Sequence, residues 1–424
     1  MSDPKLQKLV LLPTLAVSVK PDGRLGVTRK FMDGVQAFQQ RWLGPVSVLA
    51  EREVDTPDHL DQDVVNPAEL PFELKVVDFD RLLDEPALEG AGVVLGSLGF
   101  RQNHVVRVCR QRGVPCVLTS EYSLPTRNQI VDAGTRHRLL RMRRHFWERQ
   151  QEKAQRLAVR DADGLQCNGT PTFEAYATLN PKPLLYFDTR VTRDMLITKE
   201  ALDTRLAHCR THQPLRLLFS GRLVPMKGAH DLVEMARHLK GLGVPFELTI
   251  CGDGESSEAM RTAIATHGLE SQVHMVGVLD FHTELMPRVQ HQTDLFVCCH
   301  PQGDPSCTYL ETLSCGVPIV GYDNEAFNGL NRRSSAGWIT PLNDPLAMAQ
   351  RIAVLDRQRD PMSQASHRAL QFASQHTFEL TFQRRIEHLA SCVRSGTTGH
   401  STVRAKSATG TATSAQARVA TGVR

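Results

Sequence analysis

Short apolar runs alternate with longer amphipathic stretches along most of the sequence. In the first half, apolar runs bounded by turn residues predict β-strands at residues 9–12, 46–50, 74–79, 92–95, 114–119 and 164–167. Amphipathic stretches between them predict helices at residues 27–42, 104–112 and about 135–160. A second set of strands is predicted at residues 215–220, 246–251, 272–276, 295–298 and 318–322. Strands that alternate with helices in this way are typical of doubly wound parallel α/β sheets.

The alternation divides into two similar halves. His, Gln and Pro interrupt it at residues 198–214 and predict a linker, so we expect one domain at residues 1–204 and a second at 205–375. Beyond Asp356, apolar positions at helical spacing predict one or two closing helices. Residues 395–424 are rich in Ser, Thr, Gly and Ala and have few large apolar side chains, which predicts a disordered tail.

Composition narrows the class of protein. Of 424 residues, 41% are hydrophobic and 23% charged, which suffices for two cores and excludes a collagen-like or wholly disordered chain. The net charge of +4 equals the charge of the tail, which holds Arg404, Lys406, Arg418 and Arg424 and no acid. The folded part is therefore near neutral, and nucleic acid is not an expected partner.

The cysteines and the apolar runs indicate in which cellular compartment the protein is expected. Ten cysteines without dense, even spacing predict free thiols in a reducing cytoplasm. No run approaches the roughly 18 apolar residues of a membrane span. The apolar stretch at residues 9–19 is expected to begin a β-strand and not to act as a signal peptide.

The strongest local pattern follows the predicted strand that ends at residue 220. Gly221 and Gly228 flank Arg222 and Lys227 in a loop that precedes a predicted helix. A glycine-rich turn exposes backbone N–H groups, the helix adds the positive end of its dipole, and two cations add full charges, which together suit a diphosphate. The alternative is that Arg222 and Lys227 are solvated charges on an ordinary loop.

Small residues precede a second predicted helix in the same half. Gly303, Ser306 and Thr308 offer another cluster of backbone N–H groups, and Glu311 lies one turn inside the helix. Glu311 can accept hydrogen bonds from vicinal hydroxyls of a ligand, although the helix dipole alone also favours a carboxylate there. Two anion-compatible loops with an acceptor between them suit a sugar nucleotide.

The order of these motifs resembles the donor-binding half of retaining GT-B glycosyltransferases of the group 1, or family 4, type. The resemblance covers about residues 213–390 and rests on Gly-Arg-x4-Lys-Gly at 221–228, Cys-Gly-Asp-Gly at 251–254, Val-Gly at 276–277 and Leu-Glu-Thr-Leu-Ser-Cys-Gly-Val-Pro-Ile-Val at 310–320. It implies two Rossmann-like domains that face each other across a cleft. The first domain would bind the acceptor, the second would bind the nucleotide sugar, and the segment 376–394 would return to the first.

The resemblance also implies roles for individual residues. Arg222 and Lys227 would hold the donor diphosphate, and Glu311 would bond the ribose. The first Glu of the family's Glu-x7-Glu motif normally contacts the donor sugar and is replaced here by Gly303; Asp304 either supplies a shorter carboxylate or starts a turn. The full set implied to bind the donor is Gly221, Arg222, Lys227, Gly252, Asp253, Gly254, Val276, Gly277, Gly303, Ser306, Cys307, Thr308 and Glu311.

The implied reaction is retaining transfer of a hexose-type sugar from a nucleotide diphosphate sugar. The acceptor would be a glycan or a lipid-linked molecule in surface polysaccharide or glycoconjugate synthesis. Neither metal nor cofactor is needed, because cations and helix starts stabilise the departing diphosphate. The candidate catalytic residues are Arg222, Lys227, Asp304 and Glu121, of which Glu121 follows a first-domain strand where family members often have a His, or is simply a loop carboxylate.

Other functions stay open. A catalytically silent relative that binds a nucleotide sugar or a glycan is suggested by Gly303, and an epimerase or a phosphorylase can share the fold. A metal site at Cys298, Cys299, His300, Cys307 and Cys315 is not expected, because adjacent strand residues point to opposite faces and no paired Cys-x2-Cys spacing occurs.

The predicted helix at about residues 135–160 is strongly basic. It has nine Lys or Arg and two acids, Glu148 and Glu152. At helical spacing, one arc holds Leu139, Met142, Phe146, Trp147, Ala154 and Leu157, and outside it lie Arg138, Arg141, Arg144, Arg149 and Arg156. Such a helix can lie on anionic lipid, which would make the protein peripheral at the inner face of the plasma membrane. Alternatively, the stripe packs into the domain core and the basic back is solvated.

Overall fold

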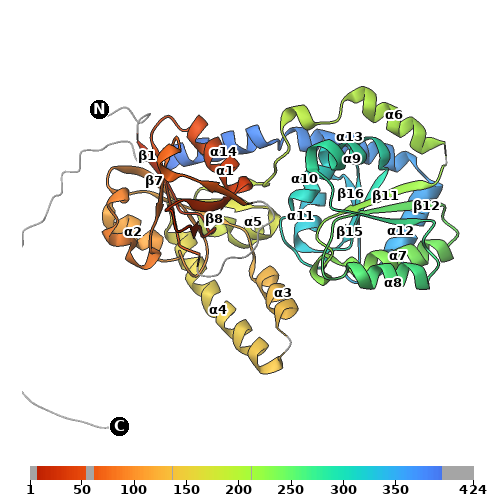
Figure 1. Ribbon diagram of the computed structural model, residues 1–424, viewed down its shortest axis with the longest axis horizontal. Coiled ribbons are helices and arrows are strands. Elements are labelled where there is room, and N and C mark those ends of the chain that lie inside the picture. Colours follow the sequence, from red (N-terminus) through yellow and green to blue (C-terminus); the bar gives the residue numbers. More distant parts are fainter. Residues whose placement is uncertain (1–6, 54–61, 136, 212, 394–424) are drawn as a thin grey trace, which may run out of the picture.

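The computed structural model describes residues 7–53, 62–135, 137–211 and 213–393. The tail that we expect to be disordered lies outside these residues. Within them the chain forms two lobes, each built on a parallel β-sheet with helices on both faces (Figure 1). This arrangement follows from strands such as β14 (Leu295–Cys298), which is buried on both faces.

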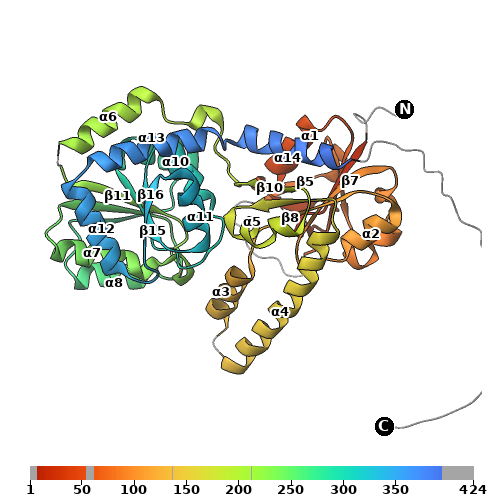
Figure 2. The same ribbon diagram turned by 180° about the vertical axis from the view of Figure 1, so that it is seen from behind.

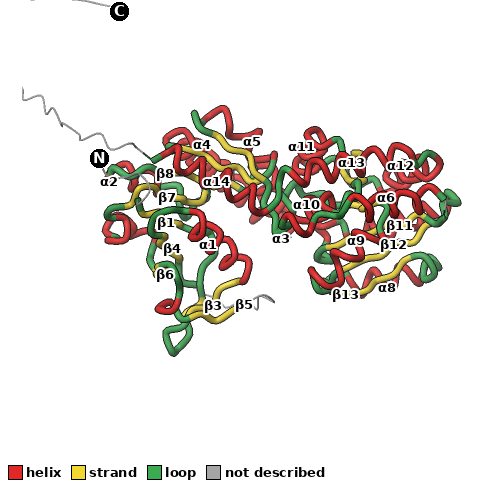
Figure 3. The backbone as a smooth tube through the Cα atoms, turned by 90° about the horizontal axis from the view of Figure 1, so that it is seen from above, coloured by secondary structure: helices red, strands yellow, loops and turns green. Residues whose placement is uncertain are grey.

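The first lobe has a seven-stranded sheet in the order β10-β9-β8-β7-β1-β4-β6. The strands are β1 (Lys8–Leu11), β4 (Val46–Ala50), β6 (Glu73–Val76), β7 (Ala91–Ser97), β8 (Cys116–Ser120), β9 (Gly164–Asn168) and β10 (Pro183–Tyr186). Figure 3 shows β6, β4, β1, β7 and β8 side by side in that order. From β1, the next strands β4 and β6 lie on one side and β7 to β10 lie on the other, so the strand order reverses between β1 and β7. Ligands of doubly wound sheets bind at such a switch point.

Helices and a small sheet complete the first lobe. The helices are α1 (Arg29–Arg41), α2 (Val105–Arg112), α3 (Leu124–Gly134), α4 (Arg138–Asp161) and α5 (Thr170–Tyr176), with 3-10 turns at Pro67–Glu69, Phe79–Asp84, Pro86–Leu88 and Ala177–Leu179. An antiparallel sheet joins β2 (Ser18–Val19), β3 (Leu25–Thr28) and β5 (Gln62–Val65).

Several predicted boundaries in this lobe were wrong, and a capping residue explains two of them. The helix predicted from residue 27 begins at Arg29, because Thr28 ends a strand and caps the helix by accepting from the Phe31 N–H. The strand predicted to reach residue 79 ends at Val76, because Asp78 caps a 3-10 turn that begins at Phe79.

The second lobe has a six-stranded parallel sheet in the order β13-β12-β11-β14-β15-β16. Its other strands are β11 (Leu215–Ser220), β12 (Phe246–Cys251), β13 (Val273–Gly277), β15 (Ile319–Tyr322) and β16 (Gly337–Thr340). The helices are α7 (Ala229–Gly241), α8 (Ser257–Thr266), α9 (Met286–Gln292), α10 (Cys307–Ser314), α11 (Glu325–Ser334) and α12 (Pro345–Arg357). The switch point of this sheet lies between β11 and β14.

The segment predicted as a linker is a helix. Thr198 caps α6 (Lys199–Arg210) by accepting from the Ala201 N–H. Leu202 and Leu206 are buried, and Leu370 of the second lobe packs against them. The boundary expected at residue 204 therefore falls inside a helix that packs on the second lobe.

The two closing helices are α13 (Asp360–Ser374) and α14 (Phe378–Cys392). Phe382 and Leu389 of α14 are buried in the core of the first lobe, with Phe38 of α1. The chain therefore crosses between the lobes twice, once after β10 and once between α13 and α14 (Figures 1 and 2).

The two crossings meet at an aromatic cluster. The Phe187 ring packs edge-on against the rings of Phe372 and His376, with centroids 5.6 and 5.0 Å apart. The Phe378 N–H donates to the Val191 carbonyl at 2.7 Å. Burial is the main cause that lowers the pKa of His376 to about 4.

Acidification should therefore destabilise the fold through His376. Its pKa is about 6.5 in the unfolded chain and about 4 in the folded one, so the unfolded state binds the extra proton between these values and stability falls as the pH drops. Between pH 7 and pH 5 we expect a loss of at most about 2 kcal/mol. Urea unfolding at both pH values measures it, and His376→Phe should remove that part of the pH dependence. The exposed His367 provides the control, because His367→Phe should leave the dependence intact; an unaltered dependence in His376→Phe would contradict the prediction.

Candidate functional site

Glycine loops follow three adjacent strands of the second sheet. The Gly221 N–H donates to the Cys251 carbonyl at 3.0 Å, and the Gly252 N–H donates to the Gly277 carbonyl at 2.7 Å. Gly252 has a φ of +131°, and a Cβ there would lie 2.0 Å from the Gly221 carbonyl oxygen. Glycine thus allows the loops after β11, β12 and β13 to pack into one continuous edge.

Asp253 and Gly254 serve mainly to build this edge. The Asp253 carboxylate accepts from the Gly254 N–H at 2.9 Å and from the Ser257 hydroxyl, and these hydrogen bonds lower the pKa of Asp253. A Cβ at Gly254 would lie 2.5 Å from the Leu223 carbonyl oxygen. Val276 is exposed at the end of β13.

Lys227 is directed toward the next loop of the sheet. It ends η7 (Pro225–Lys227), a 3-10 turn between β11 and α7. Gly228 follows with a φ of +69°, and a Cβ there would lie 1.9 Å from the Cys299 carbonyl oxygen at the end of β14. Lys227 Nζ donates to Asp304 Oδ2 at 2.7 Å, and both side chains are largely buried. Arg222, earlier on the same loop, is exposed, and its side chain makes no hydrogen bond or ion pair with the described residues.

The other carboxylate oxygen of Asp304, Oδ1, takes no part in this ion pair. Asp304 Oδ1 is buried and has no hydrogen-bond partner among the described residues. His300, also buried, packs its ring edge-on against Phe219 with centroids 5.8 Å apart. Burial, reinforced by the charge of Lys227, lowers the pKa of His300 well below its usual range. A neutral imidazole therefore lies next to the Lys227–Asp304 pair.

The start of α10 lies on the other side of the same loop. Ser306 precedes the helix without a side-chain cap, so the first-turn N–H groups, including those of Cys307 and Thr308, are not capped by it. Cys307 Sγ contacts Asp188 Oδ2 at 3.6 Å, which brings the first crossing between the lobes to this helix start. The positive end of α10 therefore faces the region between the lobes.

Glu311 is held by a residue that the sequence analysis missed. Arg190 Nε donates to Glu311 Oε1 at 2.9 Å, and Glu311 is 8% exposed. The Arg190 guanidinium lies over the Phe281 ring, 3.6 Å from its centroid. Arg190 belongs to the first crossing between the lobes, and no motif marks it in the sequence.

Gly303, the position of the absent glutamate, contacts the first lobe. The Gly303 N–H donates to Gln129 Oε1 at 3.0 Å, and Thr126 Oγ1 donates to the Gly303 carbonyl at 3.1 Å. A Cβ at Gly303 would lie 3.2 Å from both Thr126 Oγ1 and Glu325 Cβ. A side chain here would therefore meet α3 and α11. Neither Thr126 nor Gln129 belongs to a motif that marks it in the sequence.

Glu121 lies in the first lobe, apart from the other candidates. It lines a cavity of about 400 Å³ at the switch point between β1 and β7, together with Asp188 and Arg385. A second cavity of about 290 Å³ also includes Glu121. Arg222, Lys227 and Glu311 line neither cavity, and Asp188 connects the larger one to the start of α10 through Cys307.

The structure thus brings Lys227, Asp304 and the start of α10 together at the switch point of the second sheet, with Glu311 one turn inside the helix. All ten cysteines are free. Within the described ranges, no group of His, Cys, Asp and Glu is arranged to hold a metal ion, and no helix is long and apolar enough to span a bilayer.

Comparison with known sequences identifies the second lobe. The family described as Glycosyl transferases group 1 matches residues 207–371. A putative colanic acid biosynthesis glycosyltransferase, WcaL of Salmonella typhimurium, is 27% identical over 183 residues, which are 42% of this chain and 45% of that protein. The amylovoran biosynthesis glycosyltransferase AmsK of Erwinia amylovora is 33% identical over 144 residues, 32% of this chain and 35% of that protein. The chain therefore spans less than half the length of these curated relatives.

Solved structures match both lobes. The crystal structure of HepE from Anabaena, in complex with UDP, covers 91% of this chain and 100% of its own with a TM-score of 0.61 at 12% identity. A sucrose-phosphate synthase from Thermosynechococcus elongatus covers 90% of this chain and 98% of its own with a TM-score of 0.56 at 13% identity. At such low identity these likenesses concern the fold alone, and the fold is GT-B. The second lobe therefore matches the group 1 glycosyltransferases over residues 207–371, and the two lobes together share the fold of these structures.

Proposed function

We propose that this protein is a retaining, metal-independent glycosyltransferase. It moves a hexose-type sugar from a nucleotide diphosphate sugar to a glycan or lipid-linked acceptor in the synthesis of a surface polysaccharide or glycoconjugate. The observation that carries the proposal is the convergence of Lys227, Asp304 and the start of α10 at the switch point between β11 and β14. The relatives named for colanic acid and amylovoran synthesis support the polysaccharide assignment, and HepE bound to UDP or UDP-glucose supports the donor class.

In this proposal the diphosphate lies at the start of α10, where backbone N–H groups and the helix dipole favour an anion. Lys227 has two N–H donors beyond the one that it gives to Asp304, and Arg222 has all of its donors available to the donor substrate. Glu311 Oε1 is engaged by Arg190, so the ribose hydroxyls would donate to Oε2. Asp304 Oδ1 would accept from a hydroxyl of the sugar, the role that Gly303 cannot fill.

The acceptor would enter from the first-lobe cavity beside Glu121. Its hydroxyl oxygen forms the new bond to the anomeric carbon on the face that the diphosphate leaves, and its proton passes to the departing phosphate oxygen. The bond that breaks joins the anomeric carbon to that same oxygen. Lys227, Arg222 and the α10 N–H groups stabilise the charge that develops on the leaving group, so no side-chain base is required.

Arg222→Ala separates ligand binding from folding. Because Arg222 is exposed and unpaired within the described residues, we expect unchanged stability and about tenfold weaker binding of nucleoside diphosphates. Thermal unfolding with UDP and GDP measures both effects, since a ligand of the folded state raises its apparent stability. Arg237→Ala, which removes a half-buried arginine from α7, is the control and should bind normally. Equal affinity in Arg222→Ala and the wild type would contradict the assigned role.

The contacts of Gly303 favour a second candidate, a GT-B protein that binds a nucleotide sugar or a glycan without transferring it. Thr126 and Gln129 hold the loop where family members place a carboxylate. Donor hydrolysis, or transfer to a mixture of acceptors, distinguishes the candidates. Tight binding of a nucleotide sugar without any turnover would favour the silent one.

A further inference from the structure

Helix α4 carries its apolar stripe on the outside. The side chains of Leu139, Met142 and Phe146 belong to residues that are 70%, 67% and 62% exposed. One alternative from the sequence placed this stripe in the domain core; it was wrong for these three residues and for Leu157, which is 51% exposed. Burial is confined to the other end of α4, where Ala158 and Val159 enter the first-lobe core.

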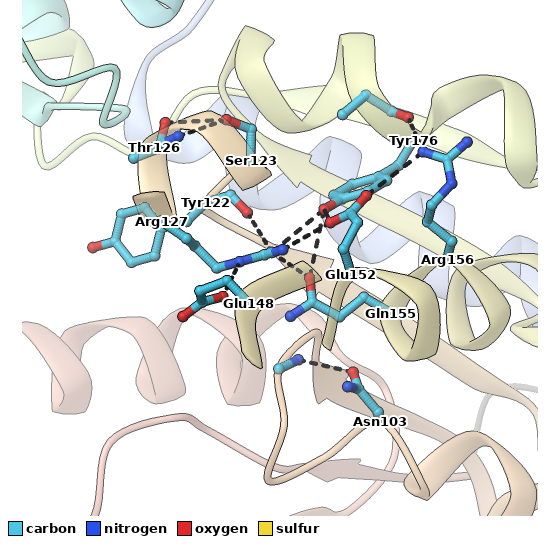
Figure 4. Close-up of polar contacts among 12 residues, drawn as sticks. Asn103, Tyr122, Ser123, Thr126, Arg127, Glu148, Glu152, Gln155, Arg156 and Tyr176 are labelled. Carbon is cyan, nitrogen blue, oxygen red and sulfur yellow. Dashed lines mark hydrogen bonds and ion pairs between the residues drawn. The ribbon is translucent and has the colours of Figure 1, made fainter. Parts of the chain in front are cut away.

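The face of α4 that meets α3 is polar instead. Arg127 of α3 donates through Nε to Glu148 Oε2 at 2.8 Å and through a terminal nitrogen to Glu152 Oε2 at 2.7 Å (Figure 4). Further along, His145 Nε2 lies 2.8 Å from Asp132 Oδ1. Glu148 and Glu152 therefore point inward, toward the largely buried Arg127. The third acid of α4, Asp161, ends the helix far from the stripe and lies 3.7 Å from Arg110, so no acid of α4 borders the stripe.

Arginines border the exposed stripe. Arg138, Arg143 and Arg149 are exposed, and their side chains form no ion pair or hydrogen bond with the described residues. Phe100 is 60% exposed and packs edge-on against Trp147 with centroids 5.4 Å apart, which extends the apolar surface to a neighbouring loop. Figures 1 and 2 both show α3 and α4 projecting beyond the two lobes.

We propose that this outer face of α4 docks on an anionic phospholipid surface. The stripe of Leu139, Met142 and Phe146 enters the boundary between headgroups and acyl chains, and the arginines contact lipid phosphates. Three observations favour lipid as the occupant: the stripe lies on a projecting helix and not in a groove, the charge around it has one sign, and a second copy of this chain would oppose arginine to arginine. Docking is separate from sugar transfer, so it holds whether or not the proposed reaction does.

Vesicle flotation with the full chain tests the proposal. The wild type should float with vesicles of phosphatidylglycerol and phosphatidylcholine at low salt, and should bind much more weakly at high salt or to phosphatidylcholine alone. The triple variant Leu139→Ser, Met142→Ser, Phe146→Ser should bind at least about tenfold more weakly. The triple variant Arg138→Gln, Arg143→Gln, Arg149→Gln should lose about tenfold or more of its binding to anionic vesicles.

A matched control uses exposed apolar residues elsewhere, Leu43→Ser, Leu242→Ser and Val354→Ser, and should float like the wild type. Each variant should keep the thermal midpoint and the nucleoside diphosphate affinity of the wild type, because the altered side chains lie on the surface. Absence of wild-type binding to anionic vesicles, or equal binding by the stripe variant, overturns the proposal. So does a dimer in light scattering that the stripe variant abolishes while no vesicle binding occurs, because a second copy would then cover the stripe.

Discussion

Lys227→Ala is expected to lower kcat/KM for sugar transfer by about 100-fold to 1000-fold. Lys227 Nζ lies at the switch point of the second sheet, next to the start of α10, where the diphosphate would leave. The variant removes a positive charge from the leaving group. It also leaves Asp304 as an unpaired carboxylate close to the same anion, so repulsion adds to the loss.

Companion variants separate these contributions in donor-consumption assays under single-turnover conditions. The double variant Lys227→Ala, Asp304→Asn removes the unpaired carboxylate. It should therefore be more stable than Lys227→Ala but no more active. Lys240→Ala, which removes an exposed lysine from α7, the helix that follows Lys227, should leave the rate unchanged. Wild-type kcat/KM in Lys227→Ala would refute the assigned role of this residue.

Arg205→Met should have the largest effect on folding, a loss of about 3 kcal/mol or more. Arg205 on α6 is 3% exposed and donates to the carbonyls of Gln290, Cys315 and Gly316 at 2.9, 2.7 and 2.6 Å. Burial lowers the pKa of Arg205 to about 10, yet the side chain stays protonated at neutral pH. Methionine is similar in length but leaves these buried carbonyl groups without their donor.

Urea unfolding at pH 7 measures the effect of Arg205→Met. Arg210→Met on the same helix provides the control, because Arg210 is exposed and its distance to Asp360 is 4.0 Å, so its loss should change stability little. If segment 198–214 were the linker that its composition predicts, the two substitutions would behave alike. Equal stabilities of the two variants would therefore contradict the packing of α6.

The central strands of the two large sheets could be predicted from the sequence, as could the edge strands β6 and β13, but the other two edge strands could not. The bounds of β11, β12 and β14 coincide with the predicted ranges, because most residues of each strand are apolar and buried and turn residues follow each strand. By contrast, β10 and β16 were missed. Both lie at sheet edges, are four residues long and have one buried residue each, so their apolar signal is weak.

The sequence placed candidate residues at strand ends but did not give their partners. Parallel topology explains why Lys227 and Asp304 meet, since their loops follow neighbouring strands. The contacts of Glu311 with Arg190, and of Gly303 with Gln129, join segments more than 100 residues apart that share no local pattern. In the same way, a helical wheel shows that α4 has two faces but not which one turns inward. That choice depends on Arg127, a residue of another helix.

The packing of α14 in the first lobe has a consequence for folding during synthesis on the ribosome. The side chains of Phe382 and Leu389 fill an interior whose other walls come from the first 120 residues or so of the chain. While the ribosome is still translating the second lobe, α14 has not yet been made, so the first lobe exposes the apolar surface that α14 later covers. Completion of the first lobe therefore depends on α14, a helix that is synthesised after the second lobe, and nascent chains halted before residue 378 should expose the apolar surface that α14 covers.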